Sequence, residues 1–136
     1  MEKAGLNQKV VAVIGDSTFL HSGITPLIDA VYNQSKITVL ILDNSTTAMT
    51  GHQEHPGTGR TLDHHATGKV RFEDLARSMG ISRVHVVDPT LNPDGFRVLV
   101  QECLDSAELA LIIARRNCLL AAGQIREYEK CEEKSD

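Results

Sequence analysis

Residues 10–17, Val-Val-Ala-Val-Ile-Gly-Asp-Ser, form a continuous apolar run that ends in a Gly-Asp turn. A second apolar run, 37–42, ends in Asp43-Asn44. Neither run alternates apolar and polar residues, which is typical of strands covered on both faces of a parallel sheet. Between them, residues 22–34 carry one apolar stripe typical of a helix, formed by Ile24, Leu27, Ile28 and Val31. The stretch therefore predicts a strand, a crossover helix and a second, parallel strand.

The two turns predict a ligand site at one edge of this sheet. Ligands of parallel α/β sheets bind beyond the carboxyl ends of the strands, where Asp16 and Asn44 are expected. Pro26 is expected in the first helical turn, with Ser22 or Thr25 as the cap. Carboxylate and amide oxygens suit Mg²⁺, which in turn binds phosphates. We therefore expect a cation that holds a diphosphate, although Gly-Asp-Ser and Asp-Asn are also ordinary structural turns.

The remaining chain continues the alternation of helices and strands. We expect a helix over 72–79, a strand over 83–87, a helix over about 96–104 and a strand over 108–114. This order predicts the α/β class, with a mostly parallel sheet flanked by helices. Residues 52–69 are glycine-rich and lack apolar periodicity, so they are expected to form a loop and a candidate lid. We expect one domain over 1–123 and a charged tail over 124–136.

Composition excludes several classes of protein. The chain has 136 residues, a net charge of −4, no basic cluster and few aromatic residues, which disfavours nucleic-acid binding. Its apolar runs are far shorter than a bilayer span, so no membrane association is expected. Its three cysteines, Cys103, Cys118 and Cys131, form no Cys-x-x-Cys motif. We therefore expect neither disulfides nor an iron–sulfur framework, and a cytoplasmic location.

Two motifs carry a resemblance to a known family. Residues 15–23 read Gly-Asp-Ser-Thr-Phe-Leu-His-Ser-Gly, and residues 42–53 read Leu-Asp-Asn-Ser-Thr-Thr-Ala-Met-Thr-Gly-His-Gln. Together they resemble the thiamine-diphosphate-binding domain of 2-oxoacid:ferredoxin oxidoreductases. The indolepyruvate ferredoxin oxidoreductase alpha subunits are most similar, because they also have a Pro-Gly-Thr-Gly turn like residues 56–59. The resemblance covers about residues 8–118 and implies the thiamine-diphosphate-binding fold.

The resemblance also implies a set of site residues. The Asp16 carboxylate, the Asn44 side chain and the Thr46 carbonyl would ligate Mg²⁺. Backbone amides that follow Gly15 would meet the diphosphate. The remaining positions implied to bind the cofactor are Ser17 and Thr18 at the diphosphate, His21 near the mouth, and Met49, Thr50 and Gly51 toward the thiazolium. No catalytic residue is assigned, and Ser17 departs from the family's more usual Gly-Asp-Gly.

The resemblance further implies an activity of a larger assembly. That assembly would decarboxylate an aryl 2-oxoacid such as indolepyruvate and pass electrons through iron–sulfur clusters to ferredoxin. The glutamate that activates the cofactor would come from a pyrimidine-binding domain or second subunit, so this chain alone is expected to be inactive. We expect association through the mouth of the site, with Phe19, Leu20 and Met49 exposed there.

Other interpretations of the same residues remain open. A dinucleotide-binding domain would use an acidic residue after the second strand, and Asp43 could serve, but Gly-x-Gly-x-x-Gly is absent. A non-catalytic remnant of the thiamine-diphosphate domain is a second alternative. Asp63 and the histidines of the 52–69 loop suggest zinc, although a solvated loop is the stronger expectation. Five other residues are expected to have no role in the site: His85 in the core, Cys118 buried, Asp88 in a turn, and Arg115 with Arg116 as surface or interface charges.

Overall fold

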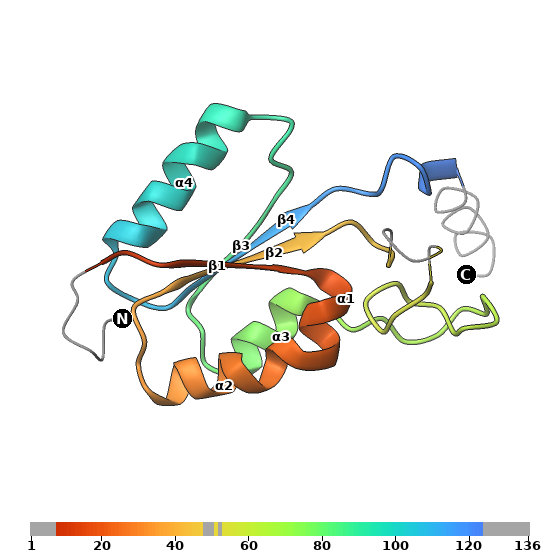
Figure 1. The fold of residues 1–136 in the computed structure, drawn as a ribbon, viewed down its shortest axis with the longest axis horizontal. Coiled ribbons are helices and arrows are strands. Elements are labelled where there is room, and N and C mark those ends of the chain that lie inside the picture. The colour runs from red at the N-terminus through yellow and green to blue at the C-terminus, as the bar shows by residue number, and fades with distance from the viewer. Residues whose placement is uncertain (1–7, 48–50, 52, 124–136) are drawn as a thin grey trace.

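The computed structural model describes residues 8–47, 51 and 53–123 of the chain (Figure 1). Helices and strands alternate along it, as the sequence predicts. The elements are β1 (Val11–Gly15), α1 (Asp16–Thr18), the π-helical segment η2 (Phe19–Gly23), α2 (Ile24–Tyr32), β2 (Thr38–Asp43), α3 (Phe72–Ser78), β3 (Arg83–Val87), α4 (Pro93–Asp105) and β4 (Ala110–Arg115).

The four strands form one parallel sheet in the order β1-β2-β4-β3. Gly15 pairs with Leu42, and Asp43 pairs with Arg115, so the last residues of β1, β2 and β4 lie at the same edge. The sheet therefore confirms the predicted α/β class. Because all strands run in one direction, the turns that follow β1 and β2 meet at the carboxyl edge.

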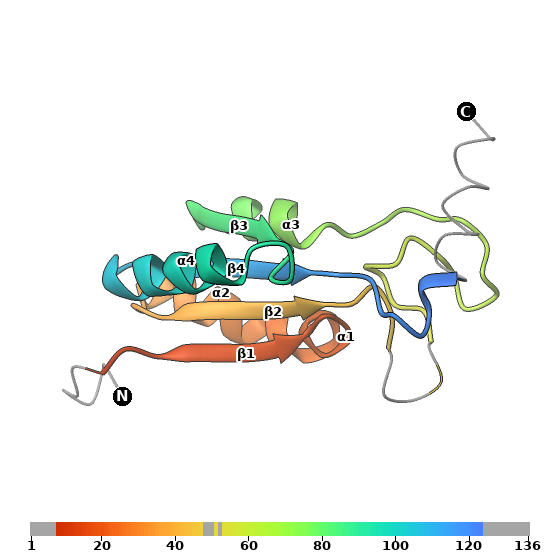
Figure 2. The same ribbon diagram turned by 90° about the horizontal axis from the view of Figure 1, so that it is seen from above.

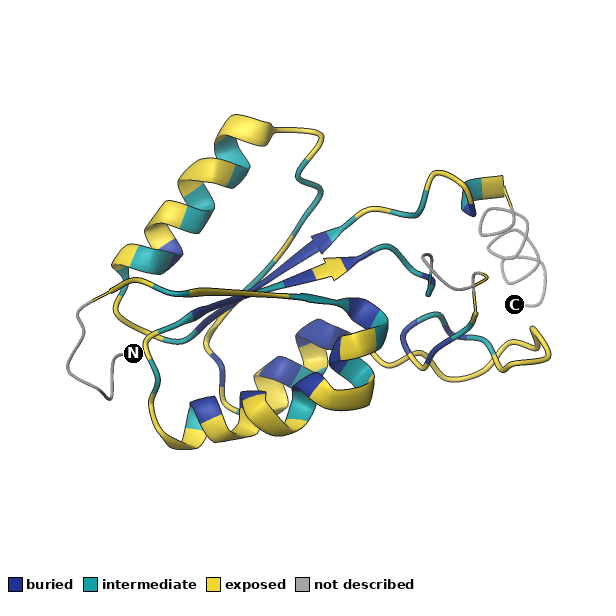
Figure 3. Cartoon of the chain, viewed as in Figure 1, coloured by how far each residue is buried: buried dark blue, intermediate teal, exposed yellow. Residues whose placement is uncertain are grey.

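Helices cover both faces of the sheet (Figures 1 and 2). The α1–η2–α2 run and α3 lie on one face, where Phe19, Ile41, Phe72, Leu111 and Ile113 form the centre of the main core. Helix α4 lies on the opposite face over a smaller core. That core contains Cys103, Ala110 and Ile112. Strand β4 is buried on both sides, shown in dark blue in Figure 3.

Strand β1 differs from the expectation of a strand covered on both faces. It is an edge strand, and α4 contacts β2 and β4. On the side of the sheet where α4 lies, Val11 and Val13 of β1 therefore remain 38% and 58% exposed. Leu42, near the end of β2 on the same side, remains 47% exposed. A continuous apolar run predicts a strand, but the number of helices above it decides how much of it is buried.

The crossover helix begins six residues earlier than expected. Helical structure starts at Asp16 and includes the π turn Phe19–Gly23 before α2. Pro26 lies in the first turn of α2, as expected, but this turn continues a helical run that began at Asp16. Proline cannot donate the hydrogen bond to the carbonyl four residues earlier, and the wider π turn directly before α2 relieves that constraint. Gly23 is required there, because a Cβ would lie 2.7 Å from the Phe19 ring.

The segment between β2 and α3 contains no helix or strand within its described residues, in agreement with the predicted loop. Its two halves differ, however. Residues 53–60 include the buried His55, Gly57 and Gly59, whereas all of 61–70 is exposed. None of the helices in the described ranges is long and apolar enough to cross a membrane. The predicted tail, 124–136, lies outside the described residues.

Candidate functional site

The carboxyl edge of the sheet collects nearly all of the buried polar side chains that the structure describes. Five of them lie there: Asp16, Asp43, Thr46, His55 and Glu73. Thr38, at the start of β2, lies at the other end. Buried polar groups carry a desolvation cost unless they are paired, so their concentration at one edge marks a built site.

Asp16 joins the two sequence motifs. It is the first residue of α1, and its carboxylate is only 5% exposed. Its Oδ1 accepts a hydrogen bond from the Ser17 N–H at 2.8 Å. Its Oδ2 accepts hydrogen bonds from the backbone N–H groups of Asn44 and Ser45, both at 3.0 Å. The structure therefore brings Asp16 and Asn44 together, as the strand ends predict.

A left-handed residue gives the second motif its shape. Ser45 has φ +60°, a conformation that non-glycine residues adopt rarely and mostly where other contacts hold them. Its N–H also reaches the Asp43 carboxylate at 3.2 Å, and its hydroxyl donates to Asn117 at 3.1 Å. The Thr46 N–H donates to the Asn44 side-chain oxygen at 3.1 Å. These bonds hold the predicted ligands Asn44 and Thr46 in one tight turn beside Asp16.

Of the other predicted residues, Ser17 contacts the second motif, whereas His21 and Gly51 are exposed. The Thr47 and Ser17 hydroxyls are hydrogen-bonded at 3.1 Å, so the first turn of α1 also touches the second motif. His21 lies in η2, is exposed, and donates from Nδ1 to the Ser17 carbonyl at 2.6 Å. Gly51 is exposed with φ +98°, a conformation that favours glycine. The predicted residues Met49 and Thr50 lie outside the described residues.

His55 is the site residue that the sequence analysis missed. Its side chain is fully buried, its Nδ1 accepts the Gly57 N–H at 3.1 Å, and its Nε2 lies 3.4 Å from Asp16 Oδ2. The expectation of a solvated loop is therefore wrong for His55, although it holds for the exposed His64 and His65. No local sequence pattern marks His55, because the close approach of Gly57, where a Cβ would lie 3.0 Å from the His55 ring, exists only in the folded chain.

The charge of Asp16 is stabilised by these neighbours. Burial raises the pKa of its carboxyl group, but the His55 imidazole and the N–H groups of Ser17 and Asn44 favour the charged form. Together they hold the pKa of Asp16 below its ordinary value. No Lys or Arg of the described residues forms an ion pair with this carboxylate. Asp16 is therefore a buried anion without an arginine or lysine partner among the described residues.

Comparison with known proteins now decides the family. The family described as "Thiamine pyrophosphate enzyme, C-terminal TPP binding domain" matches residues 2–114, most of the chain. The chain belongs to this family. TPP, thiamine pyrophosphate, is the same molecule as thiamine diphosphate. The TPP-binding fold and the thiamine diphosphate cofactor expected from the two motifs are thereby confirmed.

Similar proteins share one name. The chain is 46% identical over 124 residues to the Indolepyruvate oxidoreductase subunit IorA of Archaeoglobus fulgidus, which covers 91% of this chain and 20% of that protein. It is 40% identical over 131 residues to IorA of Pyrococcus horikoshii, a match that covers 94% of this chain and 20% of that protein. It is 38% identical over 135 residues to IorA of Methanothermobacter marburgensis, a match that covers 95% of this chain and 22% of that protein. The chain spans about a fifth of the length of these relatives.

A second carboxylate cluster of the TPP-binding domain lies beside the Asp16 site. Arg115, at the end of β4, donates from Nε to Asp43 at 2.6 Å and from Nη2 to Glu73 at 2.9 Å. Arg115, whose side chain is 32% exposed, is therefore an ion-pair partner of two buried carboxylates rather than an isolated surface charge. Because Arg115 engages Asp43, the acidic residue that a dinucleotide-binding site would need is already occupied.

The ion pairs shift the pKa values of this second cluster. Hydrogen bonds from Arg115, against the opposing effect of burial, lower the pKa of Glu73 to about 2. Glu73 in turn, together with Asp43, raises the pKa of Arg115. Arg71 adds a further contact to Glu73 at 3.2 Å. All charges of this cluster are thus compensated by protein groups.

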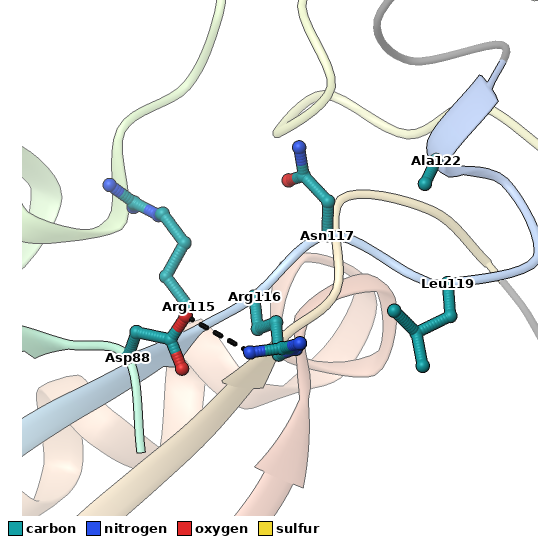
Figure 4. Close-up of a pocket in the computed structure, with 6 residues that line it drawn as sticks. All are labelled: Asp88, Arg115, Arg116, Asn117, Leu119 and Ala122. Carbon is teal, nitrogen blue, oxygen red and sulfur yellow. Dashed lines mark hydrogen bonds and ion pairs between the residues drawn. The ribbon is translucent and has the colours of Figure 1, made fainter. Parts of the chain in front are cut away.

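A cavity of about 310 Å³ lies further along the same edge (Figure 4). Its lining consists of Asp88, Arg115, Arg116, Asn117, Leu119 and Ala122. Arg116 contacts Asp88 at 3.4 Å, and Asp88 accepts hydrogen bonds from the Thr90 N–H and hydroxyl at 2.8 and 2.7 Å. Asp88 therefore is the turn residue that was expected.

The histidines of the 52–69 loop were the basis of the zinc alternative. The described residues contain no group of three or more His, Cys, Asp and Glu side chains that could hold a metal ion, so the zinc alternative gains no support there.

Phe19 is only 1% exposed and packs edge-on against Phe72, with 5.8 Å between the ring centroids. The expectation that Phe19 is exposed at the mouth of the site is therefore wrong. His85 and Cys118 are both partly buried.

Proposed function

We propose that this TPP-binding domain holds the Mg²⁺-diphosphate end of thiamine diphosphate at the carboxyl edge of β1 and β2. Asp16, the Asn44 side-chain oxygen and the Thr46 carbonyl are the proposed Mg²⁺ ligands. The observation that carries this proposal is the Asp16 carboxylate, buried between the two motifs and paired with no arginine or lysine of the described residues.

The donor set of this turn fits the cation. Mg²⁺ prefers oxygen ligands and usually takes one or two protein carboxylates together with phosphates and water. Asp16 Oδ1 accepts one hydrogen bond from the described residues, at Ser17, which leaves this oxygen room for another partner. Asn44 and Thr46 supply neutral oxygens from the same turn. One carboxylate and two neutral oxygens leave the cation a positive charge with which to bind a diphosphate.

The residues around the ligands orient and enclose the cofactor. We propose that the backbone that follows Gly15, at Ser17 and Thr18, meets the diphosphate, as N–H groups at the start of a helical run favour anions. Met49, Thr50 and Gly51 are proposed to lie toward the thiazolium, with His21 near the mouth. When bound, thiamine diphosphate supplies the electron-sink chemistry for 2-oxoacid decarboxylation, while the protein supplies position and electrostatics.

We further propose that the whole assembly is an indolepyruvate-type 2-oxoacid ferredoxin oxidoreductase. The similarity to proteins named Indolepyruvate oxidoreductase subunit IorA supports this proposal. Because those proteins are named as subunits, we also propose that the assembly contains a partner chain. A pyrimidine-binding domain or second subunit would complete the cofactor site, and ferredoxin would accept the electrons. The free thiols of Cys103 and Cys118 are consistent with a cytoplasmic setting. This chain alone is expected to show no turnover.

Calorimetric titration of the full chain with thiamine diphosphate tests the cofactor site. With Mg²⁺ present we expect saturable binding, and after chelation of the metal we expect none. A TPP-binding domain that has lost its site would bind under neither condition. Binding that does not depend on Mg²⁺ would contradict the ligand assignment.

A further inference from the structure

His55 occupies an unusual position for a loop histidine. It lies in the 53–60 half of the loop between β2 and α3, yet none of its side chain is exposed. Gly57 closes over its ring: a Cβ on Gly57 would lie 3.0 Å both from the His55 ring and from the Phe72 ring. The 53–60 segment is thus folded so that this imidazole enters the carboxyl edge.

The hydrogen bond at one ring nitrogen fixes the tautomer of the imidazole. His55 Nδ1 is 3.1 Å from the Gly57 N–H, which can only donate, so Nδ1 accepts and carries no proton. The ring proton is therefore on Nε2. His55 consequently presents an N–H group, rather than a lone pair, to whatever lies beyond Nε2.

The Asp16 carboxylate lies beyond Nε2. The distance from Nε2 to Asp16 Oδ2 is 3.4 Å, and Nε2 has no conventional hydrogen bond within the described part of the chain. A buried donor without a partner is unfavourable, so a small approach of Nε2–H to the neighbouring carboxylate stabilises the fold. Asp16 Oδ2 also accepts the backbone N–H groups of Asn44 and Ser45, so the oxygen that His55 approaches is already fixed in place.

We propose that His55 is a positioning residue for Asp16: its Nε2–H holds Oδ2, so that Oδ1 faces the cation and the 53–60 loop is coupled to the cofactor site. The inference rests on the proposed function, because it concerns the orientation of a proposed Mg²⁺ ligand. Carboxylates that ligate metals are commonly held by such outer hydrogen bonds, whose removal lowers metal affinity about 10–100-fold.

Two polar substitutions separate positioning from packing. In His55→Gln the side-chain amide can reach the position of Nε2 and donate to Asp16, whereas in His55→Asn the shorter amide can replace only Nδ1. We expect His55→Gln to keep most of the affinity for Mg²⁺ and for Mn²⁺ as its paramagnetic substitute. We expect His55→Asn to lose about 10–100-fold. Metal affinity is measured by Mn²⁺ electron paramagnetic resonance in the presence of thiamine diphosphate.

Phe72→Leu provides the matched control. Phe72 is 2% exposed and contacts the same loop through Gly57, but it has no polar atom to offer Asp16. Its replacement should lower the unfolding temperature and leave metal affinity of the folded protein unchanged. If Phe72→Leu lowers the metal affinity as much as His55→Asn does, the effect of His55 is due to packing and the proposal is wrong.

A spectroscopic measurement tests the contact without any bound ligand. Long-range ¹H–¹⁵N spectra of the histidine rings should show His55 with a bare Nδ1 and a protonated Nε2. The Nε2 resonance should move in Asp16→Asn. A protonated Nδ1, or equal metal affinity in both His55 variants, overturns the proposal. If the wild-type chain binds no thiamine diphosphate with Mg²⁺, the proposed function fails instead, and the ring spectra still report on the contact.

Discussion

Two carboxylate clusters lie side by side at the carboxyl edge, and they differ in what balances their charge. In the Asp16 cluster, which comprises Asp16, Asn44, Ser45 and His55, backbone N–H groups and one imidazole surround the carboxylate. In the Arg115 cluster, which comprises Asp43, Glu73 and Arg115, a guanidinium contacts both carboxylates directly. The difference teaches that a buried anion held by dipoles can still bind a cation, whereas one paired with arginine stabilises the fold.

The largest expected effect removes the charge of the Asp16 cluster. Asp16→Asn should abolish Mg²⁺-dependent binding of thiamine diphosphate, because the one anionic ligand is lost while an oxygen remains to accept the N–H groups of Asn44 and Ser45. Asn44→Ala should have nearly the same effect. Calorimetric titration measures the affinity, and circular dichroism checks the fold. Unchanged affinity in Asp16→Asn would refute the site.

The reverse outcome is expected for the Arg115 cluster. Arg115→Met should lower the free energy of unfolding by about 2–3 kcal/mol, because Asp43 would stay buried without its guanidinium partner and Glu73 would keep only the contact from Arg71. Affinity for thiamine diphosphate in the folded protein should change little. Urea denaturation monitored by circular dichroism provides the measurement. If Arg115→Met instead loses the cofactor at full stability, the division between the two clusters is wrong.

The pH dependence of stability should come from the same ion pairs. The pKa of Glu73 is lowered from 4.5 to about 2 in the folded chain, so its carboxylate stabilises the fold fully above pH 4.5. This contribution is lost as the pH falls from 4.5 toward 2. Asp16, whose pKa is also lowered, acts in the same direction. Thermal unfolding of wild type and Glu73→Gln across this range should show a shallower acid-side slope in the variant.

The smallest effect distinguishes the two halves of the long loop. Residues 53–60 are held to the Asp16 cluster by His55, whereas residues 61–70 are all exposed. Limited proteolysis should therefore cut first within 61–70, because local opening there breaks few buried contacts. With trypsin, the expected first cut is after Lys69. Cofactor and a partner domain should protect this half. First cleavage within 53–60 would contradict the proposed coupling of that half to the site.

The sequence predicted the elements well because periodicity and turn residues report directly on them. The strand over 83–87 matches β3, and the helix over 72–79 matches α3 to within one residue. Helix α4 begins at Pro93, three residues before the expected start, because Asn92 caps it by accepting the Gly95 N–H at 2.9 Å. The pairing of Asp16 with Asn44 was predictable because consecutive parallel strands end at one edge.

Other features depended on contacts that no local pattern contains. The burial of His55 arises from the path of a loop that returns to Asp16, and its own neighbours in sequence suggest a solvated turn. The pairing of Arg115 with Glu73 joins residues 42 positions apart, on β4 and α3. Local polarity cannot distinguish such a partner from a surface charge, because both are polar side chains next to a strand end.

The sequence by itself determined the parallel sheet, the edge where the polar turns meet and the family of the domain, since apolar runs, turn residues and two long motifs specify them. Only the tertiary structure decided which charges are compensated and which remain available. Compensation depends on the distance between side chains that the fold brings together, and the electrostatic energy changes steeply with that distance and with burial. Asp16 and Asp43 follow adjacent strands with similar turns, yet Arg115 approaches only one of them.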